Sequence, residues 1–319
     1  MPKSLTSLKD KKILVTGAHG FIGRHLTQAL EKYGACVFYK NVNIFELANI
    51  KESFDLIYHL AAKNKASTQE EVNALFYTNV EGTRRVLEFC LKNQARFIFA
   101  SSASVYQPSE PGLLLSEMSK LEPQSHYGLS KYLGEEICRY YARRYNVPMT
   151  ILRIFNAYGP GQKTPFLIPH ILENLSLLKP IELQEPHNIL DFTHVSDIID
   201  ALIISGASQA AGLHIFNIGT GCGKSVYDMS LFIIKKLKCV TPIHMNQEKQ
   251  GEIIKSYVAN IKQVHLNLQW KPTLSLKEGL EKTIASYLDL NMITETSQEA
   301  SVLQYSTTSH HRTCNIADV

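Results

Sequence analysis

The segment Thr-Gly-Ala-His-Gly-Phe-Ile-Gly at residues 16–23 decides the fold of this chain. It follows a short apolar run and precedes residues 21–33, where apolar side chains recur at helical spacing. In a strand–turn–helix of this kind, Gly17 permits the tight turn, Gly20 lets a pyrophosphate approach the backbone, and Gly23 permits close packing of the helix on the sheet. The pattern predicts a dinucleotide-binding turn. A glycine-rich connection without a ligand is the alternative.

Strand-like and helix-like segments alternate along the first half of the chain. The predicted strands are residues 12–16, 36–39, 54–62, 96–100 and 149–155. The predicted helices are residues 21–33, 79–92 and 127–145. This alternation predicts the α/β class, with a Rossmann-type doubly wound parallel sheet.

After Gly161 the pattern becomes less regular, which indicates a smaller, discontinuous C-terminal substrate domain. Further helices are expected at residues 165–178, 226–237 and 276–290, strands at 214–219 and 242–245, and a strand followed by a helix over 191–205. The expected division is a Rossmann domain at 1–162 with 191–218 returning to it, a substrate domain at 163–190 and 219–290, and a disordered Ser/Thr-rich tail at 291–319.

Composition excludes several classes of protein. The 319 residues are 45% hydrophobic and 19% charged, and 33 basic against 29 acidic residues give a net charge of +4. This balance is too mild to predict a nucleic-acid partner. No apolar segment reaches the roughly 18 residues of a membrane span, and the polar start lacks a secretory core, so we expect a cytoplasmic protein with no membrane partner. The six scattered cysteines predict free thiols and no metal site.

Tyr127 and Lys131 are spaced for acid–base chemistry. Four residues are about one helical turn, so both side chains leave the same face of a helix. A nearby ammonium lowers the pKa of a phenol, which is otherwise about 10. The pair therefore predicts a general acid–base group, although an exposed helix face has the same spacing.

A serine-rich run, Ser-Ser-Ala-Ser-Val-Tyr at residues 101–106, follows a predicted buried strand. Ligands of open α/β sheets bind at the carboxyl ends of the strands. A hydroxyl group at this edge can hydrogen-bond a substrate oxygen and share its proton with Tyr127. The alternative is a turn whose hydroxyls satisfy its own backbone.

The residues after the second predicted strand bear on the choice between NAD and NADP. A carboxylate there normally binds the adenosine ribose of NAD. Residues 38–41 read Phe-Tyr-Lys-Asn and contain none. Lys40 is therefore either a ligand of the 2′-phosphate of NADP or simply exposed. Asn43 and Ile44 are predicted to lie beside the adenine ring.

Together these motifs resemble the extended short-chain dehydrogenases/reductases of the NAD-dependent epimerase/dehydratase type. The resemblance runs from about residue 11 to 290 and rests on residues 16–23, 59–62, 79–83, 101–106, 127–131, 152–160, 191–197, 216–219 and 268–272.

The resemblance implies a role for each matched residue. The catalytic residues are Ser102 on the substrate oxygen, Tyr127 as acid–base, and Lys131 as the group that lowers the Tyr127 pKa and holds the nicotinamide ribose. The cofactor-binding residues are Gly17, Gly20, Phe21, Ile22, Gly23, Lys40, Asn43, Ile44, Leu60, Ala61, Ala62, Asn79, Ser101, Tyr127, Lys131 and Phe155. The substrate-binding residues are Ser104, Asn156 and His170.

Departures from the family pattern narrow the expected substrate chemistry. Dehydratases carry Asp-Glu after the catalytic hydroxyl, where this chain has Ala103-Ser104. Leu190 and Gln250 replace two arginines that usually help to hold a nucleotide diphosphate. Lys249, Lys255 and His170 are the candidates for that task.

The resemblance favours an epimerase of a sugar, nucleotide-activated, that works through a transient keto intermediate with NAD or NADP. A one-way NAD(P)H-dependent 4-keto-sugar reductase and a non-catalytic dinucleotide-binding sensor or scaffold are the alternatives. A homodimer paired through residues 79–92 and 127–145 is also implied.

Overall fold

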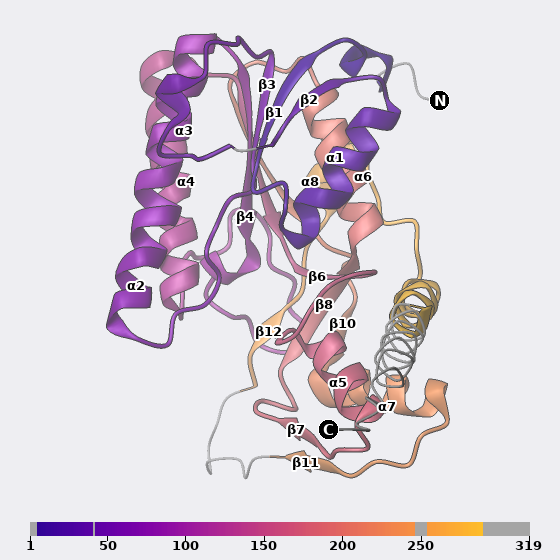
Figure 1. The fold of residues 1–319 in the computed structure, drawn as a ribbon. Coiled ribbons are helices and arrows are strands. Elements are labelled where there is room, and N and C mark those ends of the chain that lie inside the picture. Colours follow the sequence, from indigo (N-terminus) through magenta and orange to yellow (C-terminus); the bar gives the residue numbers. More distant parts are fainter. Residues whose placement is uncertain (1–4, 41, 246–253, 290–319) are drawn as a thin grey trace, which may run out of the picture.

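A six-stranded parallel sheet forms the centre of the larger part of the molecule (Figure 1). The computed structural model describes residues 5–40, 42–245 and 254–289. The strands, in spatial order, are β2 (Cys36–Phe38), β1 (Lys12–Thr16), β3 (Leu56–His59), β4 (Arg96–Ser102), β5 (Met149–Ile154) and β9 (Leu213–Ile218). Every residue of β3 and β5 is buried, as expected where helices cover both faces of a parallel sheet.

Helices cover both faces of this sheet (Figure 1). One face carries α1 (Phe21–Lys32), α6 (Val195–Ala207) and α8 (Lys262–Leu268). The other carries α2 (Gln69–Phe76), α3 (Gly82–Asn93) and α4 (His126–Tyr145). Two apolar clusters fill the two interfaces, and the predicted α/β class is confirmed. The sequence did not predict α2, which is short and whose capping box depends on Thr68 and Glu71.

The order of the strands indicates where a ligand is expected to bind. The chain passes from β1 to β2 on one side and from β2 back to β3 on the other side of β1. Such a reversal is the topological switch point, and ligands bind outside the carboxyl ends of the strands there. The connection from β2 to β3 holds only a short 3₁₀ turn, η2 (Leu47–Asn49).

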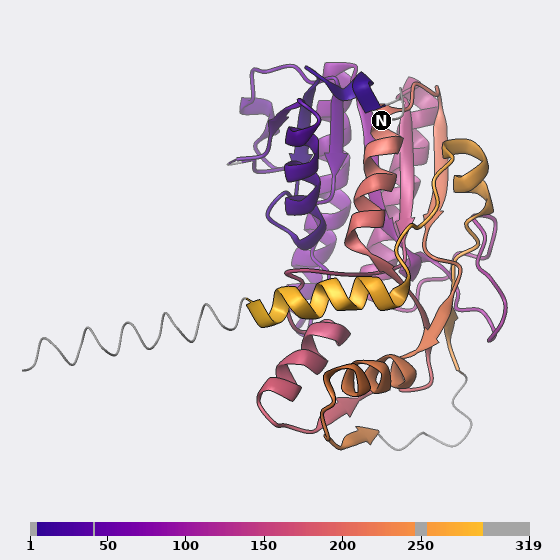
Figure 2. The ribbon, with the colours of Figure 1, turned by 90° about the vertical axis from the view of Figure 1, so that its right-hand side faces the viewer.

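A smaller unit lies beyond the carboxyl ends of these strands (Figures 1 and 2). Its elements are β6 (Asn156–Tyr158), α5 (Leu167–Ser176), β7 (Ile181–Leu183), β8 (Ile189–His194), β10 (Gly223–Ser225), α7 (Val226–Leu237), β11 (Ile243–Met245), β12 (Ser256–Tyr257) and a helix over residues 276–289. A separate apolar cluster fills it, with Ile171 and Ile233 fully buried. Strand β8 pairs with β6, β10 and β12, whereas α6 and β9 follow it back to the large sheet.

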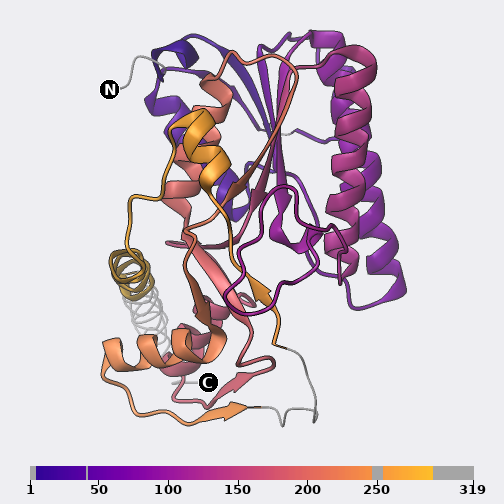
Figure 3. The ribbon, with the colours of Figure 1, turned by 180° about the vertical axis from the view of Figure 1, so that it is seen from behind.

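The segment between β4 and α4 connects the two units (Figure 3). It begins with the 3₁₀ turn η4 (Ala103–Val105) and then crosses to β12, where Ser109 bridges Ser256. Residues 249, 250 and 291–319, on which the sequence analysis made predictions, lie outside the described residues. Within the described part of the chain, no helix is long and apolar enough to cross a membrane.

Candidate active site

A cleft of about 1190 Å³ separates the carboxyl edge of the large sheet from the smaller unit. Its wall contains the following predicted site residues: Gly17, Gly20, Phe21, Ile22, Gly23, Leu60, Ala62, Ser101, Ser102, Ser104, Tyr127, Lys131, Phe155, Asn156 and His170. The far wall comes from β7, the segment that follows it, and β12. The cleft therefore joins the glycine turn, the catalytic candidates and the smaller unit in one continuous space.

The glycine turn between β1 and α1 is tight and leaves backbone donors for a ligand. Gly17 has a left-handed backbone (φ +72°), and an added Cβ would overlap the backbone of Ala61. An added Cβ on Gly23 would overlap the Gly17 carbonyl oxygen. Helix α1 begins after Gly20, and no side chain caps its first N–H groups. These N–H donors lie at the end of α1 that lines the cleft, where they can bind the pyrophosphate of a dinucleotide.

The start of α4 places Tyr127 beside Ser102. The Ser125 hydroxyl accepts a hydrogen bond from the Gly128 N–H (3.0 Å) and so fixes the first turn. An added Cβ on Gly128 would overlap the Ser104 carbonyl oxygen, so only glycine lets the helix approach the η4 turn this closely. As a result the Ser102 side chain lies near enough to Tyr127 to act on the pKa of the phenol. The Ser102 hydroxyl also donates to the Ser104 hydroxyl and accepts from the Ser104 N–H (both 3.1 Å).

Burial is the largest influence on the pKa of Tyr127. It raises this pKa, and the Ser102 side chain opposes the rise. The lowering of the Tyr127 pKa by Lys131 stays a prediction. The Lys131 ammonium lies over the ring of Phe99, 4.4 Å from the ring centroid.

Lys131 itself is a buried cation that faces the cleft. It is 3% exposed, and burial lowers its pKa to about 8. In the described part of the chain, no carboxylate lies within ion-pair distance of it. The nearby charge of Glu135 favours the ammonium but forms no ion pair with it. Such a buried ammonium gains from a ligand that offers oxygen atoms, as the ribose of a dinucleotide does.

A chain of buried hydrogen bonds runs from the glycine turn toward α4. The Thr16 hydroxyl bonds His59 Nδ1 (2.7 Å), and His59 Nε2 bonds the Thr83 hydroxyl (3.0 Å). Because Thr83 donates its proton to the Asn79 carbonyl (2.6 Å), it accepts from His59, which is therefore protonated at Nε2. Burial lowers the pKa of His59 to about 3, so the ring is neutral.

Asn79 continues this chain to the catalytic helix. Its side-chain amide donates to the Ser130 hydroxyl (2.9 Å) and to the Lys63 carbonyl (2.8 Å), and its oxygen accepts from the Lys63 N–H (2.8 Å). Ser130 in turn donates to the Tyr127 carbonyl (2.7 Å). Asn79 lies in a π-helical turn, η3 (Tyr77–Glu81), a geometry that often occurs at functional sites. Asn79 thus supports the cleft wall without lining it.

A second buried network fixes the other side of α4. Glu135 accepts two hydrogen bonds from Arg153 (2.9 and 2.7 Å) and one from Ser101 (2.6 Å). Arg153 also donates to the Tyr106 hydroxyl (2.8 Å). Glu135 and Arg153 are completely buried, and each satisfies the other's charge. The network joins β4, β5 and α4 one helical turn beyond Lys131.

The remaining cofactor candidates do not line the cleft. Lys40 is exposed beyond β2, and Asn43 accepts a hydrogen bond from the Phe45 N–H in its own turn (3.0 Å). Ile44 is buried against Gly82, and Ala61 lies beneath Gly17. Their contact with a dinucleotide stays a prediction.

Several residues of the cleft wall were not predicted as site residues. They are Asn64, Lys65, Gln124, Ser125, Gln162, Glu182, Gln184, Glu185, Asn188 and Tyr257, among others. Gln124 and Ser125 directly precede the Tyr127 helix, and their position in the sequence could have indicated them. Residues 182–188 carry no motif, and only the folding of the smaller unit brings them to the cleft.

Two aspartates of the matched motifs stabilise the fold and do not line the cleft. Asp191 accepts hydrogen bonds from the N–H groups of Thr220, Gly221 and Ala259 (2.8, 2.9 and 3.2 Å). Asp197 accepts from the Thr273 N–H and hydroxyl (2.9 and 2.7 Å). Both carboxylates therefore fix loops of the smaller unit against β8 and α6.

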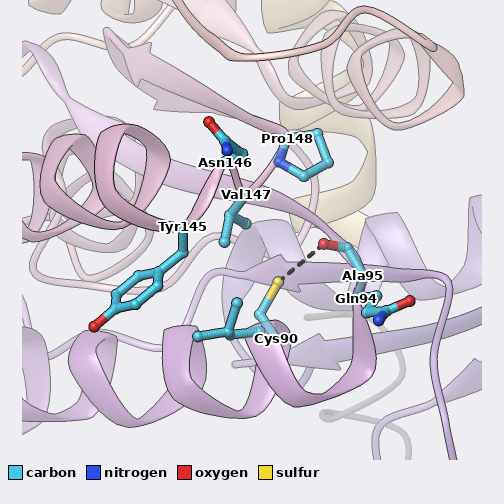
Figure 4. A pocket seen from close by; sticks show the side chains of 8 residues that line it. Cys90, Gln94, Ala95, Tyr145, Asn146, Val147 and Pro148 are labelled. Atoms are coloured by element: carbon cyan, nitrogen blue, oxygen red, sulfur yellow. Dashed lines mark hydrogen bonds between the residues drawn. The ribbon is translucent and has the colours of Figure 1, made fainter.

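A second cavity, of about 200 Å³, lies at the opposite edge of the sheet (Figure 4). It is lined by Cys90, Leu91, Gln94, Ala95, Tyr145, Asn146, Val147 and Pro148. The Cys90 thiol donates to the Ala95 carbonyl (3.2 Å), and burial raises its pKa to about 12. A thiol that is protonated and hydrogen-bonded is unreactive, so we assign no catalytic role to this cavity. Within the described residues, no group of His, Cys, Asp and Glu is placed to hold a metal ion.

The fold and the cleft define a Rossmann-type α/β protein whose cleft joins the glycine turn to Ser102, Tyr127 and Lys131. Residues 13–219 match the model of the NAD dependent epimerase/dehydratase family. The chain belongs to this family and is an NAD-dependent enzyme of the extended short-chain dehydrogenase type. The predicted family is confirmed, and the non-catalytic alternative is set aside.

Relatives of known name share most of the chain. It is 30% identical over 291 residues to the uncharacterized UDP-glucose epimerase YtcB of Bacillus subtilis (strain 168), covering 87% of this chain and 91% of that protein. It is 30% identical over 323 residues to the UDP-N-acetyl-alpha-D-glucosaminuronate decarboxylase of Bacillus cytotoxicus, covering 88% and 98%. The UDP-glucuronic acid 4-epimerase from Bacillus cereus, solved with UDP-glucuronic acid and NAD, superposes with a TM-score of 0.80 at 28% identity, covering 88% and 99%.

Proposed function

We propose that this enzyme epimerises a UDP-activated sugar through a transient keto intermediate. The observation that carries the proposal is the presence of Ser102, Tyr127 and Lys131 on the wall of the cleft that also holds the glycine turn. Residues 1–162 with 191–218 would bind NAD, and residues 163–190 and 219–290 would bind the sugar nucleotide. The names of the relatives support a UDP-sugar as the substrate class.

Each catalytic residue has a task that its surroundings support. When bound, NAD supplies a reversible acceptor for the hydride of the sugar carbon. Tyr127 removes the proton of the sugar hydroxyl and later returns it, and Ser102 hydrogen-bonds the same oxygen. Lys131, buried and without an ion pair in the described part of the chain, holds the nicotinamide ribose.

The residues after Ser102 speak against a dehydratase. Ala103 and Ser104 provide neither a carboxylic acid nor a carboxylate beside the reacting sugar. Elimination of water needs such an additional acid and base. Proton transfer at a single oxygen, as in an epimerase, requires Tyr127 alone.

A one-way reductase of a keto-sugar is the second candidate. The observation that favours it is the exposed Lys40 beyond β2, in a segment without a carboxylate. A cation at this position suits the 2′-phosphate of NADP, the usual electron donor of reductases. In that reaction Tyr127 gives a proton to the substrate and does not recover it.

Incubation of the purified enzyme with single UDP-sugars tests the proposal. UDP-glucose, UDP-galactose, UDP-glucuronic acid and UDP-N-acetylglucosamine would each be incubated with and without added NAD, and the products identified by chromatography and NMR. We expect at least one substrate to reach an equilibrium mixture of two epimers with no net formation of NADH. Net oxidation of NADPH with a keto-sugar, and no epimer from any substrate, would replace the epimerase with the reductase.

A further inference from the structure

Among the described residues, few cations line the far end of the cleft, although its expected ligand is an anion. The UDP-sugar of the proposed function carries two negative charges on its diphosphate. Leu190 occupies the place of one expected arginine, and the described cleft wall contains no arginine at all. The lysines of that wall are Lys65, Lys131 and Lys255. Lys131 belongs to the catalytic centre, and Lys65 follows Ala62 at the cofactor end.

The pairing of β12 with β8 brings Lys255, which directly precedes β12, beside Asn188, two residues before Leu190. The two strands are parallel, and Tyr257 is in register with Leu190. The Lys255 N–H donates to the Asn188 side chain (3.0 Å), and its carbonyl accepts from the Ile189 N–H (2.9 Å). Because side chains alternate along a strand, Lys255 and Tyr257 share the face opposite the buried Ser256. That face lines the cleft.

The side chain of Lys255 is partly exposed. It forms an ion pair with Glu185 (2.7 Å), and the two side chains are 39% and 48% exposed. Exposed ion pairs of this kind contribute little to stability. A diphosphate carries more charge than one carboxylate, so it can take the ammonium over at little cost. The N-terminal end of α5, which no side chain caps, lines the same cleft and adds backbone donors.

We propose that Lys255 binds the diphosphate of the sugar nucleotide in place of the missing arginines, and that Glu185 holds its ammonium until the ligand arrives. This inference rests on the proposed function. It assigns the binding of the negatively charged diphosphate to a side chain next to β12, the strand that pairs with β8. It also predicts opposite behaviour of the two members of the ion pair.

Calorimetric titration of the full chain with UDP and with uridine tests the assignment. Lys255→Met should weaken the binding of UDP by about 10- to 100-fold, because one charge-assisted contact is lost, and leave the binding of uridine unchanged. Glu185→Gln should bind UDP as well as the unmodified enzyme or better, since a competitor of the ligand is removed. Lys255→Arg should retain UDP binding. Lys236→Met is the matched control. Lys236 lies on α7, outside the cleft wall, and forms a similarly exposed ion pair with Glu281 of the helix at residues 276–289.

Each outcome bears on a different claim. Equal UDP affinity of Lys255→Met and the unmodified enzyme would overturn the assignment and leave the proposed function intact. Equal losses in Lys255→Met and Glu185→Gln, or a matching loss of uridine binding, would also overturn it, because the pair would then only support the fold. An unmodified enzyme that binds neither UDP nor uridine would overturn both this inference and the UDP-sugar substrate.

Discussion

The two halves of the cleft are built in different ways. In the cofactor half, the wall rests on buried polar groups: Lys131, Ser101 and Asn79 are almost fully buried and belong to continuous networks of packing and hydrogen bonds. In the substrate half, Lys255 and Glu185 are partly exposed and form an ion pair with each other.

The difference follows from the separate tasks of the two halves: one holds the catalytic groups and the other recognises the substrate. Catalysis needs reacting groups held in fixed positions, which buried networks provide. Substrate recognition depends on side chains that can change without disturbing the fold. The cofactor half accordingly keeps the glycine turn, Ser102, Tyr127 and Lys131 of the family pattern and lacks only the carboxylate after β2, whereas the substrate half departs from the pattern at Leu190 and Gln250.

The largest expected effect concerns the catalytic phenol. Tyr127→Phe should lower kcat by about 10²- to 10⁴-fold, because the acid–base group is lost. The affinity for NAD should change little, since the glycine turn is untouched. Turnover assays and NAD titration measure both quantities. Tyr287→Phe, on the helix at residues 276–289, is the control. An unchanged rate in Tyr127→Phe would remove the residue from the mechanism.

The glycine turn should tolerate no added methyl group at Gly23. In Gly23→Ala the new Cβ meets the Gly17 carbonyl oxygen, so the turn must shift, at a cost of about 1–3 kcal/mol. We expect the affinity for NAD to fall by about tenfold or more. Gly112→Ala, whose Cβ would meet nothing within 4 Å, should lower stability slightly through its φ of +87° and leave NAD binding intact. NAD affinity equal in both variants would contradict the assigned role of the turn.

Two buried histidines should make the fold sensitive to acid. Burial lowers the pKa of His59 to about 3 and that of His194 to about 4, whereas in the unfolded chain both titrate near 6.5. Protons then bind the unfolded chain first, so stability is full above pH 6.5 and falls as the pH decreases toward 3. At pH 5 each histidine should cost about 2 kcal/mol relative to pH 7.5.

Urea unfolding at pH 7.5 and pH 5 measures this loss. His59→Gln should lower stability at pH 7.5, because its hydrogen bonds with Thr16 and Thr83 are altered. It should also reduce the difference between the two pH values by about half. If the difference in stability between pH 7.5 and pH 5 stays as large as in the unmodified enzyme, the pKa of His59 is not lowered in the folded protein.

The smallest expected effect is a gain. Leu190→Arg should place a cation on β8, opposite Tyr257 and two residues along from the position of Lys255, and tighten UDP binding by about two- to fivefold, as one partly exposed charge contributes little. In a Lys255→Met background the same change should recover part of the lost affinity. Leu190→Met controls for side-chain length. Unchanged affinity in both backgrounds would show that position 190 does not reach the diphosphate.

The sequence indicated the glycine turn and the residues around Tyr127 on the cleft wall for a physical reason. The glycine turn and the Tyr127–Lys131 pair act through local geometry, which short motifs encode. The relation of Lys131 to Phe99, the raised pKa of Tyr127, and the path through His59 and Asn79 depend on burial and on contacts between distant strands. No short motif contains them. The substrate half was predicted least, because residues 182–188 reach the cleft only through the folding of the smaller unit.

The dinucleotide released from freshly purified, denatured protein tests the central claim most directly. Mass spectrometry identifies the cofactor, and its amount is compared with the amount of protein. An epimerase regenerates its cofactor in every cycle, so we predict about one NAD for each chain. Protein that is free of dinucleotide and binds neither NAD nor NADP on titration would contradict the account, because the glycine turn and Lys131 would then have no ligand.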